Sequence, residues 1–363
     1  MTAAEAGPSL ADLGWDRRTE ALFAEHAAQG LLPGRVLVEH RGSYVVAAGG
    51  NEHDAAVSGR FRHAVVDAEE FPAVGDWVGL SHLDGPVLIQ AVLPRKSRFA
   101  RPARGDVPGA QVVAANVDLV LIVAGLDHDY NLRRIERYLA LAWSSGAEPV
   151  IVLNKADVCP EVGERLAAVA SVAPGVPVRV TSARDGVGLD GIAPLLEAGR
   201  TVALLGSSGV GKSTLVNALL GWDRQATTEV RADDQRGRHT TTMRELLATP
   251  SGALLIDSPG MRSVGMWEAD EGIESAFSDV DALAADCRFT DCSHGPEPGC
   301  AVQAAISDGT LAAARLDSRR RLERELAALE RRRRLDRSEK RRRGRRMSKA
   351  IRGHMRAKYG EAG

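Results

Sequence analysis

The spacing of apolar residues along this chain changes near residue 33 and again near residue 110. Before the first change, residues 1–32 carry a sparse apolar stripe that predicts a helical extension, formed by Leu10, Leu13, Leu22 and Phe23. Between the two changes, short apolar runs are separated by Gly and Asp turn residues. This pattern predicts five short strands, at 35–39, 43–47, 59–65, 76–80 and 86–92. Such strands are typical of a small barrel like the oligonucleotide-binding (OB) fold.

After the second change, strongly apolar runs alternate with segments of helical periodicity. Strands are predicted at 117–123, 150–153, 178–180, 201–205 and 253–256, and helices at 132–143, 161–170, 189–196 and 213–220. This alternation predicts an α/β domain with a parallel sheet and with ligand loops at the carboxyl ends of its strands. Further helices are predicted at 301–306 and 312–334.

These patterns make the chain a multidomain protein, as its 363 residues also suggest. We expect an N-terminal helical extension (1–32), an OB-like β-barrel (33–103), an α/β domain (108–270), a helical domain with three cysteines (271–318) and a basic helical tail (319–363). The Pro- and Gly-rich stretch 101–109 is predicted to be a linker. No apolar run approaches the about 20 residues of a membrane span, and no signal-peptide pattern is present, so we expect a cytoplasmic protein.

A phosphate-binding loop is predicted at 206–213, where G-x-x-x-x-G-K-S lies between a predicted strand and a predicted helix. Its glycines allow several backbone N–H groups to point at one phosphate, and the helix N-terminus adds its positive dipole end. Lys212 is expected to reach the β- and γ-phosphates, and the Ser213 hydroxyl to bind Mg²⁺. The residues assigned to the nucleotide here are Gly206, Ser207, Ser208, Gly209, Val210, Gly211, Lys212, Ser213 and Thr214.

A guanine-specific motif, N-K-x-D, follows the predicted strand 150–153 as Asn154, Lys155, Ala156 and Asp157. The Asp157 carboxylate can accept two hydrogen bonds from the N1–H and amino groups of guanine, which adenine cannot offer. Lys155 is expected to lie along the base, and Asn154 to tie neighbouring loops together. Ser182 and Ala183, after the next strand, are expected to support the base through their backbone N–H groups. An ATP-dependent enzyme with the same phosphate loop is an alternative that Asp157 argues against.

Two later segments are predicted to sense the γ-phosphate. In G-R-H-T-T-T at 237–242, Thr241, or its neighbour Thr240, is expected to bind Mg²⁺. In D-S-P-G at 257–260, Asp257 is expected to reach Mg²⁺, and the Gly260 N–H to meet the γ-phosphate.

The residue after this motif is Met261, where many GTPases carry the Gln that orients the attacking water. We therefore expect slow intrinsic hydrolysis. His239 is the local candidate for the missing polar group, and the alternative is that His239 only orders its loop. The residues assigned to catalysis are Lys212, His239, Thr241, Asp257 and Gly260.

The order of these motifs is unusual. N-K-A-D at 154 precedes the phosphate loop at 206, and D-S-P-G at 257 comes last, whereas an ordinary GTPase begins with its phosphate loop. A circular permutation explains this order, because the termini of a domain usually lie close together. The Mg²⁺-sensing segment then leads directly into the C-terminal part of the chain.

A zinc site is predicted from C-x4-C-x-H-x5-C, formed by Cys287, Cys292, His294 and Cys300. Three thiolates and one imidazole make a closed tetrahedral site, which is structural rather than catalytic. The alternative is a set of unrelated cysteines. The fourth cysteine of the chain, Cys159, stands next to the guanine motif and is expected to have a packing role.

The net charge of −1 conceals a strong asymmetry. From residue 319 to the end, 19 Lys and Arg stand against 6 Asp and Glu, whereas the rest carries 28 against 42. Such a tail is expected to bind RNA or another polyanion through phosphates. A solvated helix face and a nuclear-targeting signal are the alternatives. The barrel offers either an RNA surface or ordinary solvated charges at Arg60, Arg62, Arg95, Lys96, Arg98 and Arg101.

In this order, the motifs resemble the circularly permuted ribosome small-subunit-dependent GTPase A (RsgA) family over residues 33–316. The resemblance also rests on Arg95-Lys96-Ser97, Ala115-Asn116-Val117-Asp118 and the apolar residue at Met261. It implies an OB-like barrel, a permuted GTPase domain and a zinc domain, with GTP as substrate, Mg²⁺ and one structural Zn²⁺. It also implies binding to 16S rRNA of the 30S subunit near the decoding region, stimulation of the GTPase by that subunit, and action late in its assembly. We expect a monomer.

By this resemblance, guanine recognition falls to Asn154, Lys155 and Asp157, phosphate and Mg²⁺ binding to 206–214, and zinc binding to the three cysteines and His294. A second hypothesis is a GTP-gated RNA-binding scaffold in which hydrolysis serves only release. Residues 1–32 and the tail lie outside the resemblance.

Overall fold

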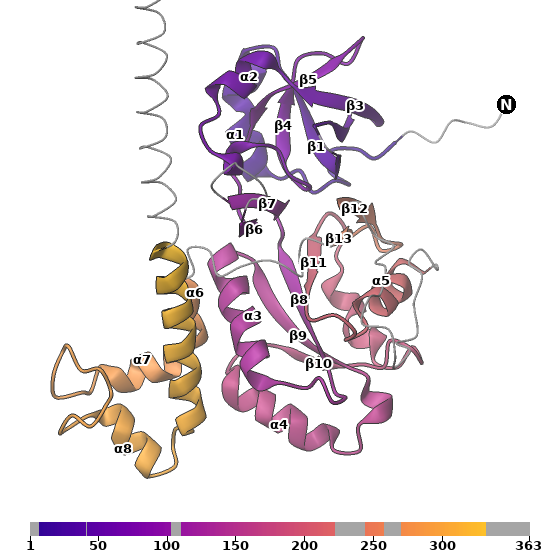
Figure 1. Cartoon of the computed structure of the whole chain (residues 1–363). Helices are drawn as coiled ribbons and strands as arrows, with labels where there is room; N and C mark the ends of the chain where they lie inside the picture. The colour runs from indigo at the N-terminus through magenta and orange to yellow at the C-terminus, as the bar shows by residue number, and fades with distance from the viewer. Residues whose placement is uncertain (1–6, 41, 103–109, 222–243, 258–269, 332–363) are drawn as a thin grey trace, which may run out of the picture.

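The architecture is taken from a computed structural model, which describes residues 7–40, 42–102, 110–221, 244–257 and 270–331 (Figure 1). A β-barrel, an α/β domain and a helical C-terminal domain follow one another along the chain. In the described part, no helix has the length and apolar character required to cross a bilayer.

The barrel consists of β1 (Leu32–Glu39), β2 (Tyr44–Ala48), β3 (Asn51–Val57), β4 (Trp77–Leu80) and β5 (Val87–Val92). Its strands are ordered β1-β2-β3-β5-β4, and β1 also pairs with β4, which closes the barrel. The interior is filled by fully buried apolar side chains, among them Val36, Val46, Leu80 and Ile89. The predicted five-stranded barrel is therefore confirmed.

One of the five predicted strands is wrong. Residues 59–65 form helix α2 (Gly59–Ala64), because the Ser58 hydroxyl accepts the N–H of Phe61 at 3.1 Å and caps the helix N-terminus. The third strand is instead β3, whose first four residues are polar and whose backbone pairs with β2 and β5. A 3₁₀ turn, η1 (Ala68–Glu70), follows.

The N-terminal extension is less helical than expected. Helix α1 (Arg17–Ala28) begins only after Asp16, whose carboxylate accepts the N–H of Thr19 at 2.7 Å. Leu10 and Leu13 lie in the turn before it. Leu13 and Phe23 are nevertheless buried, so this segment packs against the protein.

The α/β domain is built on a six-stranded part of the same sheet, in the order β10-β9-β8-β11-β13-β12. The strands are β8 (Leu119–Gly125), β9 (Glu148–Asn154), β10 (Val178–Val180), β11 (Thr201–Leu205), β12 (Arg244–Ala248) and β13 (Leu254–Asp257). All neighbours are parallel except β12 and β13. Helices α3 (Leu132–Ser145), α4 (Val162–Val172) and α5 (Lys212–Leu220) pack beside it (Figure 1).

The helix predicted at 189–196 is also wrong. This segment forms two short 3₁₀ turns, η3 (Leu189–Gly191) and η4 (Ala193–Leu195), and Pro194 lies at the start of the second. A proline has no N–H and cannot continue a helix from the preceding turn. Outside the large sheet, β6 (Arg98–Pro102) and β7 (Ala110–Ala115) form an antiparallel pair. The predicted linker 101–109 is therefore wrong at its first two residues, whose backbone pairs with β7.

The barrel and the α/β domain share one continuous sheet of 11 strands, because β12 pairs with β1. Glu39 on β1 lies opposite Arg244 on β12, and their side chains form an ion pair. The Arg244 side chain is 13% exposed and the Glu39 side chain 16%. Strand β12 follows the predicted Mg²⁺-sensing residue Thr241 in the sequence. Its pairing with β1 therefore connects the chain just after Thr241 to the barrel.

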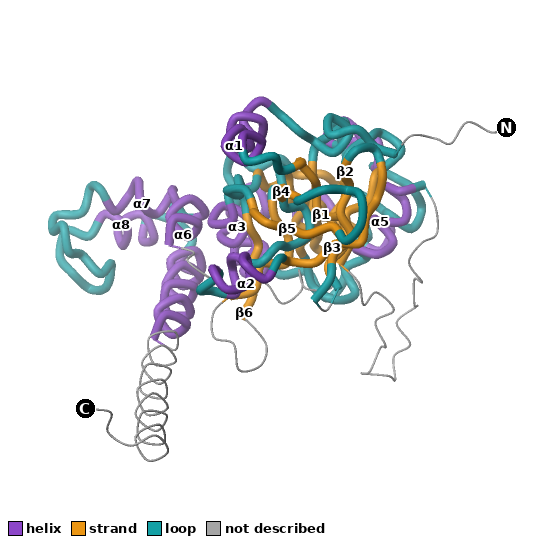
Figure 2. The backbone as a smooth tube through the Cα atoms, turned by 90° about the horizontal axis from the view of Figure 1, so that it is seen from above, coloured by secondary structure: helices purple, strands orange, loops and turns teal. Residues whose placement is uncertain are grey.

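The C-terminal domain contains α6 (Asp270–Ala276), α7 (Ser278–Ala284), α8 (Ala301–Ser307) and a long helix over 313–331. Figure 2 shows these helices on the side of α3 that faces away from the barrel strands. Helix α6 approaches α3 so closely that a Cβ on Gly272 would lie 2.1 Å from the Ala140 carbonyl oxygen. A glycine is therefore required at this contact.

Candidate guanine-nucleotide site and zinc centre

The predicted phosphate loop curls between β11 and α5 through glycines in conformations that other residues rarely adopt. The φ angles of Gly206, Gly209 and Gly211 are +153°, +84° and +91°. A Cβ on Gly206 would lie 2.4 Å from the Val123 carbonyl oxygen, so space as well as conformation excludes a side chain. The loop therefore has the shape that aims backbone N–H groups at a phosphate.

Lys212, the first residue of α5, is folded back over this loop. Its Nζ donates to the Gly206 carbonyl oxygen at 2.7 Å and also to the Ser207 carbonyl oxygen. These contacts keep the ammonium group at the loop that binds nucleotide phosphates in such motifs.

Asn154 joins three loops at the carboxyl end of the sheet and is 2% exposed. Its Nδ2 donates to the Val210 carbonyl oxygen in the phosphate loop at 2.9 Å. Its Oδ1 accepts the Ala183 N–H at 2.9 Å and the Thr181 hydroxyl at 3.1 Å. The expectation that Asn154 ties neighbouring loops is confirmed, and the N-K-x-D and Ser182-Ala183 segments lie next to the phosphate loop.

The residues predicted to read guanine are arranged around a tight turn. Lys155 has a φ of +66°, and its Nζ lies 2.6 Å from Asp127. Burial raises the pKa of Asp127, but the hydrogen bond from Lys155 and other interactions outweigh this effect and lower it. The Asp157 carboxylate is exposed and accepts the Ser182 hydroxyl at 2.8 Å.

Two residues near this site have no counterpart among the sequence predictions. Asp127 is the second residue after β8 and pairs with Lys155. Arg134, near the start of α3, donates to the Ser207 hydroxyl at 2.7 Å. The only available signal was that Asp127 follows the carboxyl end of a buried strand, where functional residues of parallel sheets gather.

Several predicted residues lie outside the described part of the chain: His239, Thr240, Thr241, Gly260 and Met261. Asp257 is described only through its backbone, as the last residue of β13.

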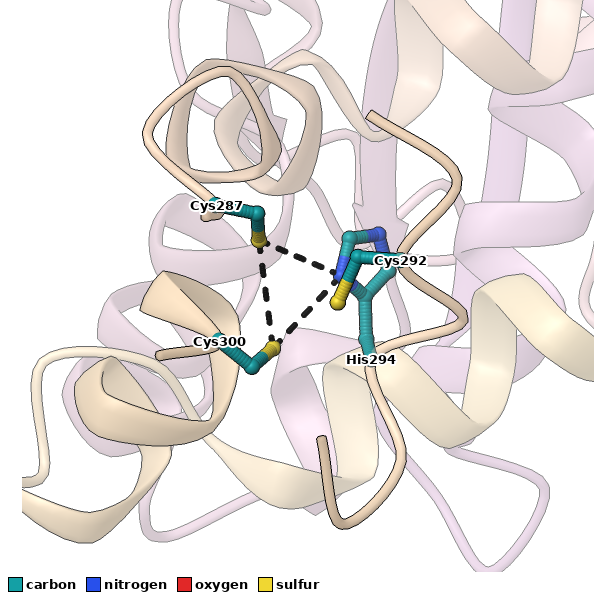
Figure 3. A group of neighbouring side chains, drawn as sticks. All are labelled: Cys287, Cys292, His294 and Cys300. Carbon is teal, nitrogen blue, oxygen red and sulfur yellow. Dashed lines mark hydrogen bonds between the residues drawn. The ribbon is translucent and has the colours of Figure 1, made fainter. Parts of the chain in front are cut away.

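The four predicted zinc ligands converge between α7 and α8, and their ligand atoms all lie within 4.8 Å of one another (Figure 3). The His294 Nδ1 atom is 3.6 Å from the Cys287 sulfur and 3.7 Å from the Cys300 sulfur, and those two sulfurs are 3.9 Å apart. Tetrahedral bonds of about 2.3 Å to sulfur and about 2.0 Å to nitrogen separate ligand atoms by about 3.5–3.8 Å. The cluster therefore fits a zinc ion.

The surrounding chain holds the ligands in place. His294 has a φ of +58°, and its carbonyl oxygen accepts from the Gln303 side chain and from Arg320. Cys300 caps α8 by accepting the N–H of Gln303 at 3.4 Å. Such contacts fix ligand orientation before a metal binds.

The basic residues predicted as candidates for an RNA surface of the barrel differ in their surroundings. Arg95 is a structural residue, because its guanidinium pairs with buried Asp76 at 2.6 Å and also donates to the carbonyl oxygens of Glu69 and Phe71. Lys96 pairs with Asp118 at the junction with the α/β domain. Arg60 and Arg62 are exposed on α2.

Comparison with known proteins places this geometry in a family. A family model described as RsgA GTPase matches residues 92–267. The small ribosomal subunit biogenesis GTPase RsgA of Opitutus terrae is 48% identical over 335 residues, which cover 89% of this chain and 91% of that protein. A protein of the same name from Syntrophotalea carbinolica is 47% identical over a match that covers 85% of this chain and 87% of that protein. The chain belongs to the RsgA GTPase family.

Solved structures support the same conclusion. YjeQ from Thermotoga maritima matches with a TM-score of 0.60 at 26% identity, covering 82% of this chain and 99% of that one. YloQ, described as a circularly permuted GTPase, matches with a TM-score of 0.60 at 23% identity and shows the same fold. Membership of the RsgA family confirms that the chain is a GTP-hydrolysing enzyme, and the permuted order of its motifs is confirmed as well.

Proposed function

We propose that this GTPase binds the 30S ribosomal subunit and that the subunit stimulates its hydrolysis of GTP late in subunit maturation. The names of the relatives support a role in small-subunit biogenesis. The observation that carries the nucleotide part is Asn154, which joins the guanine motif to the phosphate loop. A cytoplasmic, monomeric protein fits this role.

In the proposed complex, Asp157 accepts hydrogen bonds from guanine, and Ser182 keeps that carboxylate oriented. Lys155 lies along the base, held by Asp127. The loop from 206 to 214 receives the phosphates, and Lys212 turns from the loop carbonyls to the β- and γ-phosphate oxygens. A Mg²⁺ ion would neutralise charge on the phosphates, with Ser213, Thr241 and Asp257 as the residues that hold it.

The attacking water is proposed to be oriented by His239, with help from the ribosome, because Met261 has no group that can do so. Gly260 is proposed to contact the γ-phosphate through its N–H. The four-residue zinc cluster is proposed to hold one structural Zn²⁺, which would replace a hydrophobic core in this short loop.

Contact with 16S rRNA is proposed for the exposed arginines of the 313–331 helix, and for Phe289 in the zinc loop. Phe289 is 43% exposed, and the Arg288 guanidinium lies 5.4 Å from its ring centroid. Exposed aromatic rings beside arginine are suited to stacking on unpaired bases. A GTP-gated RNA-binding scaffold, with hydrolysis serving only release, is the second candidate.

The test is GTP turnover by the purified chain with and without purified 30S subunits. Strong stimulation by 30S is expected, and a turnover that 30S leaves unchanged would overturn the proposed coupling. His239→Ala separates the two candidates. Normal subunit maturation by a variant that no longer hydrolyses GTP would favour the scaffold.

A further inference from the structure

Arg134 contacts the phosphate loop from outside every nucleotide-binding motif. Its Nη1 donates to the Ser207 hydroxyl at 2.7 Å and to the Asp129 carboxylate at 2.6 Å. The backbone of Arg134 is fixed as well, because the side chain of Asn131, the N-cap of α3, accepts its N–H at 3.2 Å. Helix α3 therefore holds the Arg134 guanidinium against Ser207, the second residue of the phosphate loop.

The segment that carries Arg134 also contacts the base side of the site. Lys155 pairs with Asp127, and Asp127 Oδ1 accepts the N–H of Asp129 at 3.1 Å. Asp129 in turn pairs with Arg134. The segment 127–134 thus links the guanine motif to the phosphate loop through a continuous series of polar contacts.

Ser207 is held from two sides, by Lys212 on its carbonyl oxygen and by Arg134 on its hydroxyl. When Lys212 turns to the phosphates, the Ser207 carbonyl loses that donor, while the contact with Arg134 remains. We propose that Arg134, oriented by Asp129, is a positioning residue that keeps the phosphate loop in its binding shape when Lys212 engages the nucleotide. This inference rests on the proposed roles of Lys212 and of the phosphate loop.

The test compares the full-length protein with Arg134→Ala, using binding of fluorescent GDP and the kinetics of GTP hydrolysis. A charge-assisted hydrogen bond of this kind corresponds to about a tenfold change in affinity. We expect Kd and KM to rise by about that factor, with a smaller change in kcat, because Arg134 touches the loop and not the reacting phosphate.

A matched control is Arg133→Ala, which removes the same charge from the preceding position of α3, where the side chain is exposed. It is expected to bind GDP like the wild type. Ser207→Ala should reproduce the Arg134→Ala defect, and the double variant Arg134→Ala/Ser207→Ala should be no worse than either single one.

Additive losses in the double variant, or an Arg134→Ala protein that matches Arg133→Ala, would overturn the inference. A lower melting temperature of Arg134→Ala and Ser207→Ala without a rise in the Kd for GDP would also overturn it, because a merely structural arginine would behave in that way. The wild type reports separately on the proposed nucleotide site, since failure to bind GDP there would reject that site itself.

Discussion

Glu136 on α3 and Arg315 on the C-terminal helix form an ion pair of 2.7 Å in which both side chains are 3% exposed. Arg315 also pairs with Asp279 at 2.8 Å, and its guanidinium lies 4.3 Å from the ring centroid of Phe277. This one arginine therefore joins α3, α7 and the long C-terminal helix. Since Arg134 lies on the same helix as Glu136, α3 contacts both the phosphate loop and the C-terminal domain.

Replacing Arg315 with Ala should release the C-terminal domain from α3. The change leaves Glu136 buried without its cation, which typically costs about 3–5 kcal/mol. We expect a lower free energy of unfolding in a denaturant titration and faster proteolysis between α6 and the C-terminal helix. Arg321→Ala, on the exposed face of the same helix, is the control. Equal stability of the two variants would contradict the structural role of the pair.

Replacing Cys292 with Ser should abolish binding of the proposed zinc ion. A closed Cys₃His site needs all four ligands, and the loop between α7 and α8 has little buried apolar surface of its own. We expect about one equivalent of zinc by metal analysis in the wild type and about none in the variant. The control variant Cys159→Ser changes a cysteine outside the cluster, so this protein should still bind about one equivalent of zinc. GDP binding should survive in both, because the nucleotide site lies on the sheet.

Replacing Asp157 with Asn should weaken GTP binding and relax base choice. The amide can no longer accept two hydrogen bonds from guanine, but its NH₂ group can donate to the C2 carbonyl oxygen of xanthine. We expect GTP affinity to fall by about 100-fold and XTP affinity to rise, measured by competition against fluorescent GDP. Asp185→Asn is the control, because Asp185 also contacts the Ser182 hydroxyl at 2.8 Å. Unchanged selectivity in Asp157→Asn would remove Asp157 from the base contact.

Local motifs made much of the site predictable, whereas contacts between distant segments did not. The phosphate loop and N-K-x-D were found because each role falls on neighbouring residues. Arg134 and Ser207 are 73 positions apart, and no periodicity connects them. The same limit applies to Arg95, which the sequence offers as a candidate surface cation and which the structure pairs with buried Asp76.

The predictability of the fold also depended on whether its signal is local in the sequence. Buried parallel strands are continuous apolar runs, so β8, β9 and β11 could be located from sequence. Strand β3 was missed because it begins with four polar residues, and its backbone pairing rather than its side chains makes it a strand. The alternation of Arg60, Phe61 and Arg62 suggests a strand, but these residues form a helix because the Ser58 side chain caps its N-terminus.

Replacing Arg35 with Met should loosen the junction between the barrel and the α/β domain. Arg35 is 1% exposed, donates to the Gly75 carbonyl oxygen at 3.3 Å and to Thr201 Oγ1 at 2.8 Å, and also bonds the Leu13 carbonyl oxygen. Burial lowers the pKa of Arg35 to about 10. Because Met leaves the Leu13 carbonyl oxygen and Thr201 Oγ1 without this donor, whereas Asn116 still donates to the Gly75 carbonyl oxygen, we expect a loss of about 2–3 kcal/mol in unfolding free energy. Arg35→Lys should restore little of this lost stability, because an ammonium group cannot reach the three acceptors that the planar guanidinium of Arg35 bonds. Full rescue by Lys would contradict this explanation.

Removing the exposed arginines Arg321, Arg324 and Arg331 should weaken binding to 30S subunits and reduce its dependence on salt. No described carboxylate forms an ion pair with any of them, and with Arg320 they lie along one face of the 313–331 helix. Each RNA phosphate that the variant no longer neutralises should lower the slope of log K against log salt by about 0.7–0.9. Asp317→Asn, on the same face, should act in the opposite direction, because it removes a negative charge. A triple Ala variant with an unchanged slope would place the RNA-binding surface elsewhere on the protein.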